Sequence, residues 1–148
     1  IFAGSVIENR KWAFALPLFS LIFSDVIIQA LHMANPSMVP GFYKGQFVNY
    51  LLILATTVIG FFIHQRKPNQ ILAGAISAPI IYFLLSNTSV WISGGGYIRP
   101  KTMEGFFMAL SDGLPFLKTS LAGTVVFSVL FFGLSAMMAS KKQNVYQA

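Results

Sequence analysis

Apolar residues in this chain gather into long runs separated by short polar stretches. The clearest run, Trp12–Met33, holds roughly 22 residues and would form about 33 Å of helix at a rise of about 1.5 Å per residue. The hydrocarbon core of a bilayer is about 30 Å thick. The run therefore predicts a helix that crosses a membrane, and Pro17 predicts a kink in it because proline removes one helical hydrogen bond.

Later runs have the same character and predict three more spans: Phe47–Ile63, Ile71–Ile92 and Leu114–Ala139. The short apolar stretch Ile1–Ile7 ends at a polar turn and is typical of the tail of a further helix. A native chain begins with Met, so we expect residues to be absent before Ile1 and the full-length chain to have six helices. A single membrane domain, incomplete at its N-terminus, would then cover residues 1–148.

The longest connection, Ser93–Gly113, has a different pattern. One face of it is apolar at helical spacing: Met103, Phe106, Phe107 and Leu110. A helix of about ten residues is too short to span and suits the membrane interface. Thr102 predicts its start, and Asp112, Gly113 and Pro115 predict its end. The predicted fold is an all-α integral membrane protein with four full transmembrane helices, the tail of a further N-terminal helix, and one short interfacial amphipathic helix.

The third predicted span opens with a cluster of small residues between Ala73 and Ala78. Gly74 and Ala78 are four residues apart, the spacing at which small side chains let another helix come close. We therefore expect a tight helix–helix contact at this point.

The composition supports a membrane protein. Only 9% of residues are charged and 55% are hydrophobic, whereas about 25% of a soluble domain is charged. The net charge of +6 does not indicate nucleic-acid binding, because the basic residues sit in short loops. The positive-inside rule places one basic group in the cytoplasm. That group is Arg10, Lys11, Arg66, Lys67, Lys141 and Lys142. The predicted location is the bacterial inner membrane, with the C-terminus in the cytoplasm.

Three polar residues share one stripe of the first span: Asp25, Gln29 and His32. A carboxylate at mid-membrane costs about 2.5–3.5 kcal/mol, so Asp25 must face protein, water or a ligand. One interpretation is an outward-opening polar pocket for a small solute or a proton. The other is a structural hydrogen bond from Asp25 to an Asn, Ser or Thr on a neighbouring helix, where Asn49, Thr56 and Thr57 are available. The candidate substrate-binding residues of this group are Asp25, Gln29, His32 and Asn49.

A second candidate group lies further along the chain. Asn87 and Trp91 are four residues apart and could hold a planar ligand, or could belong to an aromatic belt and a helix cap. The following connection could form a lid over an anionic ligand or carry solvated charge. Its candidate residues are Tyr97, Arg99, Lys101 and Glu104.

The sequence shows no nucleophile–base pair, no paired catalytic carboxylates and no phosphate-binding loop, since Gly94–Gly96 lacks the following Lys and Ser or Thr. Two His and no Cys do not make a pattern for a transition-metal site. We expect neither an enzyme nor a metal or cofactor.

Several stretches resemble an uncharacterised family of small bacterial multi-pass proteins. The matching stretches are FAG (2–4), KWAFALPLFSLIFSD (11–25), SNTSVW (86–91), RPKTMEG (99–105) and LPFLKTSLAG (114–123). Family members usually show TNF-x-VW, YPKT-x-x-G and IPFF-x-NT-x-x-GD. In the last stretch this chain has Thr119, Ser120 and Thr124 where the family has Asn, Thr and Asp. The family also begins with an extra helix and an N-F-T-P stretch that this chain lacks.

Members of that family are distantly similar to the substrate-binding S components of energy-coupling-factor transporters. The resemblance implies a membrane-embedded component that binds a small solute for uptake. The alternative is a non-catalytic accessory subunit of a larger membrane complex. The interior of the protein distinguishes these two functions, because a solute-binding protein needs a pocket lined by polar residues from several helices.

Overall fold

The structure is a computed structural model that describes residues 1–94 and 97–145, with side chains up to residue 139. Its regular elements are α1 (Phe2–Val6), α2 (Arg10–Ala34), α3 (Gln46–Gly60), α4 (Pro68–Ser93) and α5 (Met103–Val145). The all-α prediction is confirmed. Three segments are long and apolar enough to cross a membrane: Arg10–Ala34, Pro68–Ser93 and Met103–Ala139.

Helix α3 is shorter than the predicted second span. It has 15 residues and ends at Gly60, because the chain turns over Phe61 and Phe62 instead of continuing the helix to Ile63. The turn places the Ile63 side chain against α4, where it is buried. The three long segments are therefore fewer than the four full spans that the apolar pattern predicted.

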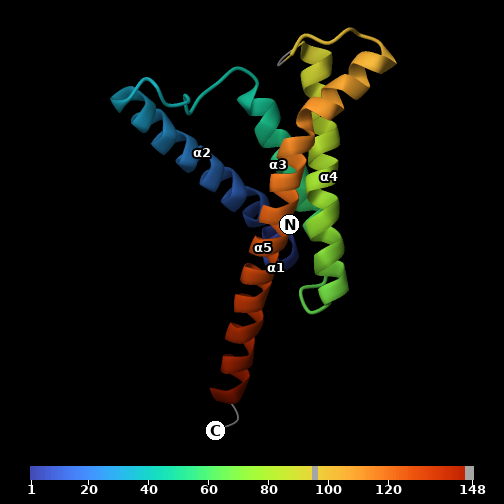
Figure 1. The fold of residues 1–148 in the computed structure, drawn as a ribbon. Coiled ribbons are helices and arrows are strands. Elements are labelled where there is room, and N and C mark those ends of the chain that lie inside the picture. Colours follow the sequence, from blue (N-terminus) through green and yellow to red (C-terminus); the bar gives the residue numbers. More distant parts are fainter. Residues whose placement is uncertain (95–96, 146–148) are drawn as a thin grey trace.

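The prediction of a separate interfacial helix is wrong. Residues 103–113 form the first turns of α5, which runs unbroken through Pro115 for 43 residues (Figure 1). The apolar side chains that suggested an interfacial face are largely outward, with Met103 and Phe107 more than half exposed. The buried face of this segment consists instead of small residues at a spacing of four: Gly105, Ala109 and Gly113. Packing of that face against neighbouring segments keeps the chain helical through Asp112, Gly113 and Pro115, which were predicted from the sequence to end the helix.

Close helix contacts in this fold depend on residues without large side chains. A Cβ on Gly4 of α1 would lie 2.2 Å from the Thr57 carbonyl oxygen of α3. A Cβ on Gly74 of α4 would lie 2.1 Å from Cδ1 of Ile63. Gly74 is buried, and so are Ala75 and Ala78. The small residues between Ala73 and Ala78 are thus packed closely, as predicted, but the partner of Gly74 is a side chain of the turn before α4 and not another helix.

The helices do not form an even bundle. In Figure 1, α4 and α5 run side by side, α3 lies against α4, and α2 slants away from the other helices. The most apolar stretch of α2 has no buried residue, as expected for a helix whose surroundings are lipid. The lower part of α5 extends past the turn between α3 and α4. Three polar residues of α2, Asp25, Gln29 and His32, make their side-chain hydrogen bonds with α3 and the loop before it.

Candidate functional site

Asp25 is held by the first turns of α3. The Gln46 side-chain amide donates to Asp25 Oδ2 at 2.5 Å, and the Tyr50 hydroxyl donates to the same oxygen. Gln46 is only 6% exposed and also donates to the Gly41 carbonyl at 2.9 Å. Gln46 and Tyr50 are four residues apart on one helix face, and that spacing is the signal by which sequence reasoning could have found them.

The rest of the α2 stripe holds the loop between α2 and α3. Gln29 Oε1 accepts from the backbone N–H groups of Gly41 at 3.0 Å and Phe42 at 3.3 Å. His32 Nδ1 lies 2.5 Å from the Met38 carbonyl oxygen. A Cβ on Gly41 would lie 2.1 Å from the Asp25 carbonyl oxygen, so only glycine fits there. Each polar side chain of the stripe thus has a partner within the chain.

Asn49 extends this polar network to α4. Its side-chain N–H donates to the Tyr43 hydroxyl at 3.0 Å, and its Oδ1 accepts from the Tyr82 hydroxyl. The Tyr43 N–H in turn donates to Gln46 Oε1 at 3.3 Å. Neither tyrosine was among the candidate site residues proposed from the sequence. Their hydrogen bonds connect the α2–α3 loop, α3 and α4 in one network.

Tyr82 also lines an open cavity of about 340 Å³ between α3, α4 and α5. The lining residues are Ile1, Ile53, Thr56, Ala78, Pro79, Tyr82, Ser120 and Thr124. Four hydroxyl side chains from three helices therefore face one space, and no charged side chain lines it. The volume lies in the range of about 300–1,000 Å³ typical of ligand pockets.

The hydroxyls of the cavity differ in what they offer a ligand. Tyr82 donates its proton to Asn49, and Thr56 donates to the Ile53 carbonyl at 2.6 Å. Both oxygens keep lone pairs for accepting. The side-chain hydroxyls of Ser120 and Thr124 make no hydrogen bond with any part of the chain that the structure describes. None of the ten candidate residues proposed from the sequence lines this cavity.

The second candidate group surrounds the connection between α4 and α5. Trp91 Nε1 donates to the Pro100 carbonyl at 2.9 Å, and its ring meets Phe106 edge-on with centroids 5.4 Å apart. Lys101 Nζ donates to the Ile92 carbonyl at 2.9 Å and lies 5.3 Å from the Trp91 ring centroid. Its charge thus lies at the C-terminal end of α4, where a cation is stabilising.

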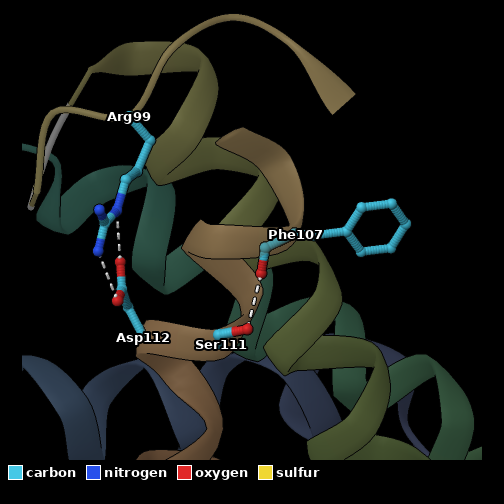
Figure 2. Close-up of polar contacts among 4 residues, drawn as sticks. All are labelled: Arg99, Phe107, Ser111 and Asp112. Carbon is cyan, nitrogen blue, oxygen red and sulfur yellow. Dashed lines mark hydrogen bonds and ion pairs between the residues drawn. The ribbon is translucent and has the colours of Figure 1, made fainter. Parts of the chain in front are cut away.

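An ion pair completes this connection (Figure 2). The Arg99 guanidinium donates to Asp112 from Nε at 3.0 Å and from Nη2 at 2.9 Å. Hydrogen bonding to the Asp112 carboxylate raises the pKa of Arg99 above its ordinary value. The Arg99 guanidinium also lies 5.5 Å from the Tyr97 ring centroid, and Tyr97 is largely exposed. The Ser111 hydroxyl, in the same view, donates to the Phe107 carbonyl at 2.9 Å.

Asn87 belongs to the same connection. Its side-chain N–H donates to the Phe83 carbonyl at 2.8 Å, and a Cβ on Gly113 would lie 2.5 Å from its Oδ1. The candidate residues thus fall into two clusters, one at each connection. Within the described ranges, no hydrogen bond joins the two clusters. The same ranges hold no group of three or more His, Cys, Asp or Glu residues placed to bind a metal ion.

Comparison with protein families gives one match, and it covers nearly the whole chain. The model of DUF6580, a family of unknown function, matches residues 1–146. The chain belongs to this family. No curated protein and no solved structure matches it. In this DUF6580 protein, the RPKTMEG stretch closes the α4–α5 connection, because Arg99 pairs with Asp112 and Thr102 Oγ1 accepts from the Gly105 N–H at 3.2 Å.

Proposed function

We propose that this DUF6580 protein is a membrane-embedded component that binds a small solute for uptake and resembles the S component of an energy-coupling-factor transporter. The observation that carries the proposal is the cavity between α3, α4 and α5. Polar side chains from several helices that face one space are what a solute binder needs.

The cavity favours an uncharged solute with hydrogen-bonding groups. A charged solute would be desolvated in a site that offers no opposite charge, which is costly. Tyr82 and Thr56 present acceptor oxygens, because their protons already bond within the protein. Ser120 and Thr124 can donate or accept. They occupy positions where the family resemblance expects Thr and Asp, so this face of α5 keeps a polar character.

The sequence-predicted residues would then support the site from a distance. Asp25, Gln29 and His32 fix the α2–α3 loop, and Asn49 fixes the Tyr82 hydroxyl that faces the solute. The second cluster would close the same end of the protein between α4 and α5; it consists of Asn87, Trp91, Tyr97 and Lys101. In this proposal these residues orient the binding side chains, and the protein performs no reaction on the solute.

The basic residues support a location in the bacterial inner membrane, with the C-terminus in the cytoplasm. In this arrangement α3 would act as a fourth, short span that the α2–α3 loop completes, and α1 would end a preceding helix. The full-length chain would then have six helices, with its long connections outside.

A non-catalytic accessory subunit is the second candidate function. It is favoured by the α2 stripe, because Asp25, Gln29 and His32 all bond within the chain. Such satisfied groups need no ligand. The cavity is the feature that this alternative leaves without a role.

A co-purification experiment separates the two functions. The wild-type protein is purified in detergent, and small molecules released on denaturation are identified by mass spectrometry. Thr124→Leu should abolish solute recovery, because a larger apolar side chain fills the cavity and removes a hydroxyl. Val126→Leu is the matched control, since Val126 is 56% exposed on the same helix and does not line the cavity. Failure to recover any solute, or equal recovery from both variants, contradicts the binding proposal.

A further inference from the structure

A second hollow lies at the N-terminal end of α4, whereas the solute cavity lies at the middle of that helix. It has a volume of about 500 Å³, and its polar lining comes from Gln65 and Arg66 in the turn before α4 and from Ser135 of α5. Across from them lie small residues of lower α5, among them Gly133 and Ala136. We call this space the head cavity.

An apolar hollow of about 200 Å³ adjoins the head cavity along α4 and α5. The two share three lining residues: Pro68, Ile71 and Phe132. The apolar hollow continues along α4 and α5 between Leu72, Val125 and Val129. We call the two hollows together the α4–α5 groove. It has a polar end and an apolar channel, and it shares no lining residue with the solute cavity.

The polar end carries unneutralised positive charge. The Arg66 guanidinium has no hydrogen bond or ion pair with any residue that the structure describes. Arg66 precedes the first residue of α4, a segment long and apolar enough to span, so it lies where phospholipid headgroups begin. Basic Arg10 lies nearby, since its guanidinium is 5.3 Å from the Phe61 ring in the turn between α3 and α4.

We propose that the α4–α5 groove binds an anionic phospholipid. Its phosphate would meet Arg66, whose planar guanidinium can donate two parallel hydrogen bonds to phosphate oxygens. One acyl chain would lie along the apolar channel beside Val129. The combination favours a lipid over a free phosphate, because a free anion would leave the adjoining apolar channel unfilled.

Native mass spectrometry of the full chain in detergent tests the headgroup. The probes are dioleoyl-phosphatidylglycerol, dioleoyl-phosphatidylcholine and glycerol phosphate, which has the phosphate without acyl chains. Phosphatidylglycerol should bind more tightly than phosphatidylcholine. Arg66→Gln should weaken phosphatidylglycerol binding about fivefold and weaken phosphatidylcholine binding less, because the choline cation of phosphatidylcholine lies beside its phosphate and cancels its net charge. Lys11→Gln is the control, because Lys11 is a basic residue near the same end and does not line the groove.

A matched pair of tryptophan variants tests the channel. Val129→Trp should lower the occupancy of both lipids several-fold, because the indole fills the channel. Val126→Trp should leave occupancy unchanged, since Val126 is also more than half exposed on α5 but does not line the channel. Equal binding of the two lipids, or equal effects of Arg66→Gln and Lys11→Gln, overturns the charge assignment. Displacement of phosphatidylglycerol by glycerol phosphate, or equal effects of the tryptophan variants, overturns the lipid assignment.

Discussion

The α2–α3 and α4–α5 connections are both held in place by side chains, but by different kinds of interaction. The first is held by side chains of α2 and α3 that reach into the loop, and its central residue, Gln46, is 6% exposed. The second is held by an ion pair with side chains 32% and 30% exposed and by a lysine 5.3 Å from the centre of the half-buried Trp91 ring. Buried polar groups are costly to leave unpaired, whereas exposed ion pairs contribute little. The first connection should therefore dominate stability.

The two connections also differ in whether their hydrogen bonds continue to the solute cavity. The α2–α3 network continues through Asn49 to Tyr82, which lines the solute cavity. The α4–α5 cluster has no such continuation among its described contacts. Substitutions in the first network should affect solute binding, and substitutions in the second should affect mainly local order. The following predictions test this difference.

The largest effect is expected from Asp25→Leu. It removes the acceptor of the Tyr50 hydroxyl and one of the three acceptors of the Gln46 amide, and leaving the part-buried Tyr50 hydroxyl without its acceptor costs about 1–3 kcal/mol. Thermal unfolding in detergent measures the loss. Asp25→Asn should melt almost normally, because its side-chain oxygen can still accept. Ser24→Leu, on the neighbouring exposed position, is the control, and a loss as large as that of Asp25→Leu would contradict the network's importance.

Asn49→Leu should have a smaller effect on stability and a clear effect on solute recovery. It removes the acceptor of Tyr82 and the donor to Tyr43, at about 1 kcal/mol for a lost hydrogen bond. The Tyr82 hydroxyl then turns freely at the cavity, so less solute should co-purify. Val48→Leu changes an exposed neighbour and should alter neither measurement. Normal solute recovery with Asn49→Leu would show that the network does not reach the site.

Two glycine substitutions in α5 should have opposite signs. Gly113→Ala places a Cβ 2.5 Å from Asn87 Oδ1, whereas nothing lies within 4 Å of a Cβ on Gly123. Alanine favours a helix over glycine by about 1 kcal/mol, so Gly123→Ala should raise the melting temperature. Crowding at Gly113 opposes that gain, and Gly113→Ala should lower the melting temperature. If both variants were stabilised alike, the contact between α4 and α5 would be looser than described.

The smallest effect is expected from Arg99→Gln. The pair with Asp112 is exposed enough for water and salt to screen it. The melting temperature should fall only slightly at low ionic strength, and the difference from wild type should vanish at high ionic strength. A loss comparable with that of Asp25→Leu would reverse the ranking of the two connections.

The sequence determined the features that depend on local pattern. A bilayer demands long apolar helices, so the runs around Asp25 and after Pro68 were recognisable from composition and length. The requirement for partners at Asp25 also followed from its depth alone. The small residues around Gly74 marked a close contact for the same reason, because only small side chains allow one.

Tertiary structure alone decided which distant residues meet. The partners of Asp25 are Gln46 and Tyr50, not the shorter side chains further along α3, because the loop folds back onto α2. Helix α5 continues through Pro115 because its small-residue face packs on neighbouring segments. The cavity and the α4–α5 groove exist only where several helices converge. Periodicity describes one helix at a time, so it shows which face is polar but not what that face will meet.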